Sequence, residues 1–250
     1  MINNTGRRFW EIDFFRGLAI IIMIFFHVFY ALYYFDVLTF NIFKSTWIYL
    51  AISGFSIFFI LVGISLTLSY SKNIINHKSK SQIFYHNLRR GLMIFCWGLL
   101  ITVITWFFIR EDYVIFGVLH FIGISIIIAY PFLRLKYWNI LFGIIIILIG
   151  LSLRAFSFDL PWLLWLGFRP HNFFTVDYFP LLPHFGIILI GIALGNIFYE
   201  NYRRNYSIPD LSKYLGMKFF CFLGRHSLVI YLLHQPILIL ILISLGIINI

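Results

Sequence analysis

The sequence is poor in charge, because only 11% of its 250 residues are Asp, Glu, Lys or Arg, whereas a soluble globular domain has about a quarter. Its two cysteines, Cys96 and Cys221, give neither a disulfide framework nor the spacing of a metal site. The sequence lacks a phosphate-binding P-loop, a dinucleotide-binding glycine motif and a Gly-x-Ser-x-Gly elbow. The low charge and the apolar composition exclude an ordinary cytosolic enzyme and a disordered tail, and the two cysteines exclude a secreted disulfide scaffold.

Hydrophobic residues make up 62% of the chain, and aromatic residues make up 21%. A soluble protein of this length cannot hide so much apolar surface. Apolar runs of about 20 residues are long enough to cross a bilayer and too long for the strands of a barrel. We therefore predict an all-α, polytopic membrane bundle forming one domain over 8–248, after a short cytoplasmic segment, 1–7. The seven predicted spans are 13–35, 47–71, 88–109, 114–133, 138–156, 179–199 and 227–247.

The net charge of +10, from 19 basic against 9 acidic residues, indicates membrane topology rather than a nucleic-acid partner. Cytoplasmic loops of membrane proteins concentrate Lys and Arg. With the N-terminus inside, fourteen basic residues fall on the inner side and four on the outer side, namely Lys44, Arg110, Arg154 and Arg169. The pattern predicts a multi-pass protein of the cell membrane with a cytoplasmic N-terminus and an external C-terminus.

The longest outer connection, 157–178, is rich in Trp and Phe rather than in polar residues. Such a segment favours the membrane interface over bulk water. Two interpretations remain open. The loop is either an aromatic anchor at the outer interface or a lid over an outward-facing cavity, which would carry Arg169, His171 and Asp177.

The first predicted span holds three ionisable residues on one face. Asp13 and Arg16 are three residues apart and can pair. His27 follows Arg16 by eleven residues, which is three helical turns plus about 20°, with a rise of ~16 Å. Ionisable groups inside a span are costly, so each is a functional candidate. For Arg16, the alternative is a snorkelling anchor paired with Asp13.

Other histidines fall in the predicted spans. His120 and His184 lie about as deep from the outer surface as His27, so three helices could bring three histidines into one layer. His234 lies nearer the middle of the last span. A helix–helix hydrogen bond is the alternative role for His120, His184 and His234. A three-histidine metal site is conceivable from depth alone, but no local ligand spacing supports it, and we expect no metal.

The stretch D-F-F-R-G-L-A-I-I-I-M-I-F-F-H, residues 13–27, resembles the opening signature of transmembrane acyltransferases. The spacing of Arg16 and His27 is similar to that of the acyltransferase-3 family, which O-acylates surface glycans. The chain as a whole resembles the heparan-alpha-glucosaminide N-acetyltransferase catalytic-domain family. The further supporting stretches are 59–66, 116–125, 177–195 and 224–236.

The resemblance implies transfer of an acetyl or short acyl group from cytosolic acyl-CoA to an amine or hydroxyl acceptor, a sugar or glycan, across the bilayer. The acyltransferase-3 likeness implies His27 as general base or, alternatively, as the residue that carries the acyl group. The catalytic histidine of the eukaryotic N-acetyltransferase does not carry over, because the segment after the first span offers no histidine. The remaining implied site residues are Asp13, His120 and His184 for catalysis, Arg16, Arg89, Arg90 and Arg225 for acetyl-CoA, and Asp177, Arg169 and His171 for the acceptor.

Two other classes of function stay open. The first is a transporter or flippase whose histidines relay protons, although the sequence has no inverted repeat and no paired broken helices. The second is a structural assembly subunit, which would leave Asp13, Arg16 and His27 without a role. A homodimer is an open alternative, and the sequence does not identify the acceptor.

Overall fold

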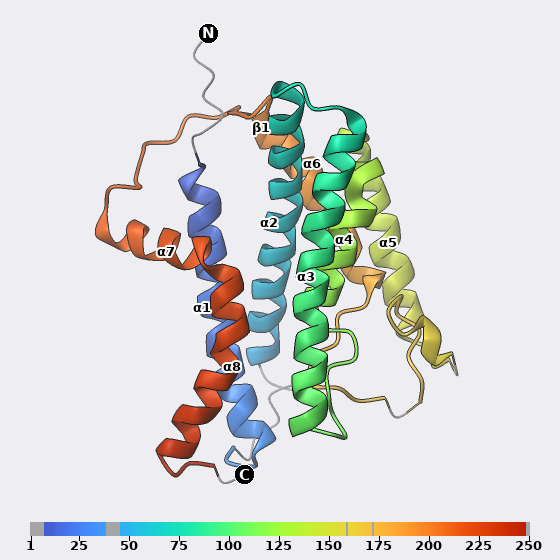
Figure 1. Ribbon diagram of the computed structural model, residues 1–250, viewed down its shortest axis with the longest axis vertical. Coiled ribbons are helices and arrows are strands. Elements are labelled where there is room, and N and C mark those ends of the chain that lie inside the picture. Colours follow the sequence, from blue (N-terminus) through green and yellow to red (C-terminus); the bar gives the residue numbers. More distant parts are fainter. Residues whose placement is uncertain (1–7, 39–45, 159, 172, 249–250) are drawn as a thin grey trace. The chain divides into compact units, whose positions relative to one another are not determined.

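A computed structural model describes residues 8–38, 46–158, 160–171 and 173–248 (Figure 1). The predicted segment 1–7 and Lys44 lie outside these ranges. The described residues form eight α-helices and one short β-hairpin. The helices are α1 (Trp10–Tyr34), α2 (Trp47–Ile75), α3 (Lys80–Phe108), α4 (Val118–Phe132), α5 (Asn139–Leu153), α6 (Leu181–Phe198), α7 (Leu215–Arg225) and α8 (Ser227–Ser244); the strands are β1 (Tyr199–Glu200) and β2 (Arg203–Arg204).

The helices confirm the predicted class of a polytopic helical membrane protein. Six helices of the described chain are long and apolar enough to cross a membrane, with α5 counted from Lys136 through a preceding turn of 3-10 helix. The remaining predicted span, 114–133, is the apolar helix α4, which has only 15 residues. Its first four predicted residues belong to the loop that leads into the helix.

The chain divides into two compact units. The first unit comprises residues 1–61 and 208–250 and contains α1, the first half of α2, α7 and α8. The second comprises residues 62–207 and contains the rest of α2, α3 to α6 and the hairpin. Within the first unit, α1 and α8 run in the same direction (Figure 1). That direction agrees with the predicted seven-span order, in which five spans separate 13–35 from 227–247.

Helix α7 was not among the predicted elements. Its sequence, LGMKFFCFLGR, is too short to span a bilayer and is amphipathic. It packs against the first turns of α1 with almost no side chain between the two backbones. A Cβ atom at Gly17 would overlap the carbonyl group of Phe220, and one at Gly224 would overlap the carbonyl oxygen of Asp13. Small residues at such crossings let two helices approach closely.

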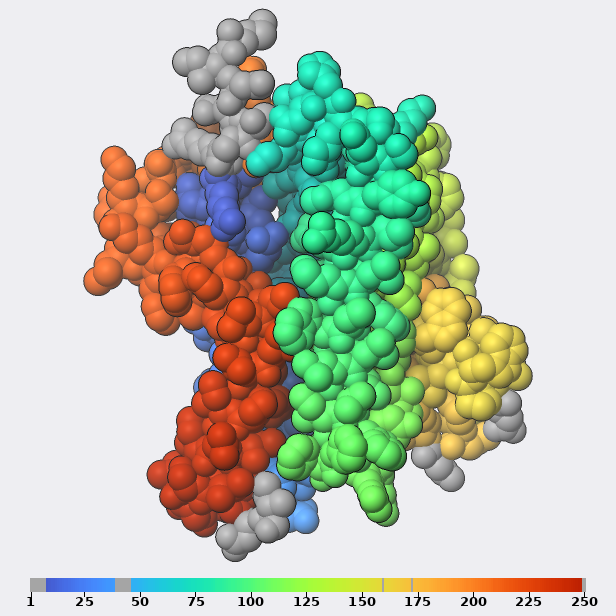
Figure 2. Space-filling model, viewed as in Figure 1, coloured from blue at the N-terminus to red at the C-terminus, as the bar shows by residue number. Residues whose placement is uncertain are grey.

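In the second unit, α6 is the central helix. Its side chains Ile188, Leu189 and Ile192 are fully enclosed, and Thr67 of α2 donates a hydrogen bond to the Ile192 carbonyl at 3.0 Å. Helix α3, in contrast, exposes a long apolar face on the side shown in Figure 2. An apolar surface of that extent on α3 is suited to contact with lipid.

Helix α3 begins eight residues before its predicted span, at Lys80. Ser79 and Gln82 form a capping box: the Ser79 hydroxyl accepts from the Gln82 backbone at 3.3 Å, and the Gln82 side chain accepts from the Ser79 backbone at 2.9 Å. The helix therefore extends beyond its apolar part on the predicted cytoplasmic side.

At the other end of the second unit, two connections pair with each other. Phe116 and Tyr178 form a parallel bridge, and Val176 donates to the Asp112 carbonyl at 3.1 Å. The aromatic connection 157–178 is tied to the start of α6, because Leu181 donates to the Trp165 carbonyl at 2.9 Å. These bonds satisfy backbone groups in segments that are neither helix nor regular sheet.

Candidate functional site

The cytoplasmic end of the predicted stripe is a charged cluster on α1. Arg16 donates a hydrogen bond to the Asp13 carboxylate at 3.4 Å, which confirms the predicted pairing. Asp13 and Glu11 are both buried, with exposed fractions of 7% and 5%. The positive charges of Arg16, Arg8 and Arg225 all act on Asp13. The cluster therefore places three cations around buried acids at one end of α1.

Arg225 reaches this cluster because of the α1–α7 crossing. Gly224 lies against the backbone of Asp13, and Arg225 is the next residue, at the end of α7. Its Nε donates to the Cys221 carbonyl at 3.1 Å. Cys221 in turn donates to the Trp10 carbonyl at 3.3 Å, and burial raises the pKa of its thiol. Cys221 is thus a packing residue of the crossing rather than a nucleophile.

The other end of the stripe is a pair of histidines. His27 of α1 and His234 of α8 lie with their ring centroids 4.8 Å apart in an edge-to-face arrangement. The Nδ1 atom of His27 is 2.8 Å from the Met23 carbonyl, and that of His234 is 2.5 Å from the Tyr231 carbonyl.

These contacts assign the tautomers of both rings. A carbonyl oxygen only accepts hydrogen bonds, so each Nδ1 carries a proton and each Nε2 carries the lone pair. The Nε2 atom of His234 is buried and has no hydrogen-bond partner among the described residues. The pair therefore presents two basic nitrogens in the interior of the first unit.

His120 has a different environment. It is buried, with an exposed fraction of 2%, and its Nδ1 accepts from the Gly117 backbone at 3.2 Å. Its Nε2 therefore carries the proton and donates to the Thr102 hydroxyl at 3.4 Å, while that hydroxyl donates to the Val114 carbonyl at 2.7 Å. These bonds occupy both ring nitrogens, so His120 ties the start of α4 to α3.

Asp177 also acts at the start of α4. Its Oδ2 accepts a hydrogen bond from the Val118 backbone at 3.1 Å. A carboxylate at a helix N-terminus satisfies a free N–H group and complements the helix dipole. Asp177 therefore joins the aromatic connection to α4.

His184 lies in the first turn of α6 and faces an arginine. Its Nδ1 is 2.8 Å from the Pro180 carbonyl, so its Nε2 is the acceptor. Arg154, the residue that follows α5, places its Nη2 3.5 Å from that nitrogen. Nearby, the Arg169 guanidinium lies 5.4 Å from the ring centroid of Tyr178. His171 is exposed, and no contact of its ring is found in the described part of the chain.

The predicted layer of three histidines is divided between the units. His27 belongs to the first unit, whereas His120 and His184 belong to the second. No group of three or more His, Cys, Asp or Glu residues suited to a metal ion occurs among the described residues. The predicted acetyl-CoA residues are divided in the same way, with Arg16 and Arg225 in the first unit and Arg89 and Arg90 on α3 in the second.

The sequence of the chain was compared with models of known protein families. The family model described as heparan-alpha-glucosaminide N-acetyltransferase, catalytic, matches residues 8–236. The chain belongs to this family. Comparison with curated proteins and comparison with solved structures each gave no match.

Membership in the heparan-alpha-glucosaminide N-acetyltransferase family confirms the resemblance inferred from the sequence. The family is one of transmembrane acetyltransferases that use acetyl-CoA as donor. The matched range includes Asp13, Arg16, His27 and His234 and ends at Pro236, within α8. The chain is therefore a multi-pass membrane protein of an acetyltransferase family.

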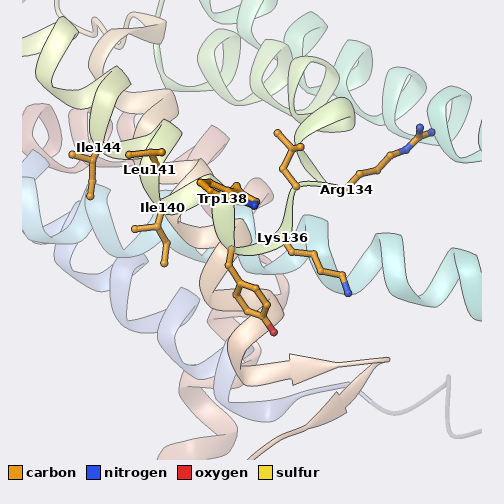
Figure 3. Close-up of a pocket in the computed structure, with 8 residues that line it drawn as sticks. Arg134, Lys136, Trp138, Ile140, Leu141 and Ile144 are labelled. Carbon is orange, nitrogen blue, oxygen red and sulfur yellow. The ribbon is translucent and has the colours of Figure 1, made fainter.

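A shallow pocket of about 650 Å³ lies elsewhere in this family member, at the turn between α4 and α5 (Figure 3). Arg134 and Lys136 extend from one end of the pocket, and Ile140 and Ile144 of α5 line its other end (Figure 3). Arg134 donates to the Tyr130 hydroxyl at 3.3 Å, and this hydrogen bond raises the pKa of Arg134. None of the predicted site residues lines this pocket, so it is separate from the candidate site.

The sequence interpretation missed three residues that contact predicted site residues. His234 was placed near the middle of its span but not beside His27. Arg154 was counted only for topology, and Tyr178 was not singled out. The sequence signal for both is their position: Arg154 lies at the outer end of the predicted span 138–156, and Tyr178 directly precedes the predicted span 179–199.

Proposed function

We propose that the protein transfers an acetyl or short acyl group from cytosolic acyl-CoA to an amine or hydroxyl of an extracytoplasmic sugar or glycan, in the cell membrane. The observation that carries this proposal is the arrangement on α1. A basic nitrogen of His27 lies deep in the first unit, and a cluster of cations lies ~16 Å away at the beginning of the same helix. Family membership supports acetyl-CoA as donor.

His27 acts as the general base in this proposal. Its Nε2 takes the proton from the acceptor amine or hydroxyl while the acceptor atom attacks the thioester carbonyl carbon. The C–N or C–O bond forms, the C–S bond breaks, and the thiolate leaves with the proton that His27 held. A positioned base of this kind contributes about 10²–10⁴-fold to a rate. Direct transfer needs no acyl-enzyme.

His234 assists His27. Its Nε2 lone pair is buried without a partner in the described chain, and the two rings are in contact. A proton taken up at His27 can therefore be shared with a second imidazole, which spreads a charge that is costly inside a membrane. His234 is a positioning and proton-sharing residue in this proposal, and it does not touch the reacting atoms.

The remaining predicted residues take supporting roles. Arg16 and Arg225 bind donor phosphates, since guanidinium groups pair well with phosphate oxygens, and Arg89 and Arg90 are proposed to do the same from α3. Asp13 orients Arg16. The proposed acceptor-side residues are His120, His184, Asp177, Arg169 and His171, with positioning as the role that the contacts of His120 and Asp177 support.

The test compares binding and transfer in purified protein. Isothermal titration measures acetyl-CoA binding, and radiolabelled acetyl-CoA with glucosamine as probe acceptor measures transfer. We expect wild type and His27→Ala to bind acetyl-CoA alike, and His27→Ala to transfer about 100-fold more slowly or worse. His226→Ala is the matched control, because His226 is exposed and its Nδ1 also lies near a carbonyl of its own chain, that of Phe222.

Two results would contradict the proposal. If the wild-type protein does not bind acetyl-CoA at millimolar concentration, the donor is wrong. If His27→Ala transfers as fast as His226→Ala, His27 is not the base.

The contact between His27 and His234 also favours one other function, a transporter or flippase in which the pair relays protons. That function predicts proton-dependent flux in liposomes and no cleavage of the thioester. Measured thioester cleavage that His27→Ala abolishes would reject it.

A further inference from the structure

The second unit brings two arginines together at its predicted outer end. Arg169 lies over the ring of Tyr178, 5.4 Å from the centroid, and Arg154 lies 3.5 Å from the Nε2 of His184. The charges of both arginines act on Tyr178, and the charge of Arg169 acts on Arg154. Within the described residues, neither arginine forms an ion pair with a carboxylate.

The neighbours of these arginines are held in place by hydrogen bonds. The Tyr178 hydroxyl donates to the Leu164 carbonyl at 2.7 Å, and the Arg169 carbonyl accepts from the Phe158 backbone at 2.9 Å. The His184 ring is fixed by the Pro180 carbonyl, so its Nε2 can accept from Arg154. Both guanidinium groups therefore lie against side chains whose own positions are set by the backbone.

Two like charges in this environment are unfavourable without a counter-charge. Desolvation, and next the positive charge of Arg169, lower the pKa of Arg154. Asp177, eight residues after Arg169, uses its Oδ2 at the start of α4. An anion between the two guanidinium groups would remove the repulsion, because charge-assisted hydrogen bonds from arginine to an oxyanion are strong and often bidentate.

We propose that Arg154 and Arg169, with Tyr178 and His184 beside them, form a binding site for a phosphate group, and that the acylated acceptor carries this phosphate. Two cations match the two negative charges of a pyrophosphate or phosphate monoester, whereas a carboxylate supplies only one. The part that concerns the acceptor rests on the proposed function, and phosphate binding itself does not.

The surroundings of the site favour a phosphate attached to a lipid. Trp162 and Phe174 of the same connection are exposed by 69% and 53%, and Trp165 by 40%. Exposed aromatic side chains of this kind lie at the level of lipid headgroups. A sugar phosphate in water and a lipid-linked sugar phosphate share the chemistry that the arginines recognise, and two probes separate them.

The experiment measures binding of inorganic pyrophosphate to detergent-purified protein by isothermal titration. Arg154→Gln and Arg169→Gln are compared with Arg110→Gln, which removes an exposed arginine at the same predicted surface, just after α3. We expect saturable binding by wild type and by Arg110→Gln, and about tenfold weaker binding in each of the other two variants, the loss typical of one charge-assisted hydrogen bond. Arg169→Lys keeps the charge and should retain part of the affinity.

Three results would overturn the site: no saturable binding by the wild type, equal loss in Arg110→Gln, or tighter binding of galacturonate, a carboxylate probe, than of pyrophosphate. Size-exclusion profiles check that each variant is folded, and Arg169→Lys tests the site if Arg169→Gln does not fold. In the second arm the protein is placed in nanodiscs that contain phosphatidic acid, and pyrophosphate binding is measured again. Weaker pyrophosphate binding in these nanodiscs would show that the lipid phosphate competes for the site and would support the lipid-borne source. Acetyl-CoA binding is measured in the same samples. A protein that binds pyrophosphate but not acetyl-CoA would reject the proposed function and leave the phosphate site in place.

Discussion

The crossing of α1 and α7 leads to a prediction about a single methyl group. In Gly224→Ala the new Cβ would lie closer than 3.0 Å to the Asp13 backbone, and the obstructing atoms cannot rotate away because they are main-chain atoms. The two helices must therefore separate. Overpacking of this kind costs about 1–3 kcal/mol, against a gain of at most ~1 kcal/mol in helix propensity. We expect a net loss of about 1–2 kcal/mol in the free energy of unfolding.

Gly216→Ala in the same helix is the matched control. A Cβ atom at Gly216 meets nothing within 4 Å, so this variant keeps the propensity gain without the overlap. The assay is the apparent melting temperature in one detergent, where 1 kcal/mol corresponds to roughly 2–4 °C in a chain of this size. We expect Gly224→Ala to melt below wild type and Gly216→Ala at or above it. Equal melting temperatures in the two variants would refute the close backbone contact.

Three other outcomes are expected. Asp177→Ala should lower the free energy of unfolding by about 1 kcal/mol, because the start of α4 loses its acceptor; a melting temperature unchanged from wild type would contradict this. Burial raises the pKa of Tyr178 to about 12, so the neutral phenol is the form that the fold stabilises. Between pH 10 and 12 the free energy of unfolding of the wild type should fall, whereas that of Tyr178→Phe should not fall for this reason. Urea unfolding at several pH values measures both, and an identical pH dependence in the two proteins would exclude the effect. His234→Phe should slow acetyl transfer less than His27→Ala does while acetyl-CoA binding stays constant, which single-turnover kinetics would show, and a wild-type rate would remove His234 from the mechanism.

The sequence predicts the spans well because hydrophobicity extends over whole helices, and each long apolar run marks one of them. It does not predict α7, whose 11 residues are too few for a span and which packs against α1. It also misses the early start of α3, although Ser79 and Gln82 carry the capping signal. Local patterns near the spans were hidden by the stronger hydrophobic signal.

One contact between residues of the predicted site is present in the structure, and another was not foreseen. The Asp13–Arg16 pair follows from helical periodicity alone, and the structure contains it. The contact of His27 with His234 does not follow, because counting residues from the start of each span places the two at different depths. Since α7 occupies the level of Gly17 on α1, α8 begins further along that helix, and seven residues from Ser227 are then enough to bring His234 to His27. The depth of a helix thus depends on its neighbours, which hydropathy does not record.

The shortness of α4 has a consequence for the bilayer itself. Fifteen residues rise only ~22 Å, which is about 8 Å less than the hydrocarbon thickness. Such hydrophobic mismatch is relieved when the bilayer thins locally or when protein fills the difference. Here the bonded segments around Phe116 and Tyr178 provide paired backbone at the end of α4. We therefore expect this side of the protein to prefer thinner membranes, and lipids of shorter acyl chains to stabilise it more than long ones.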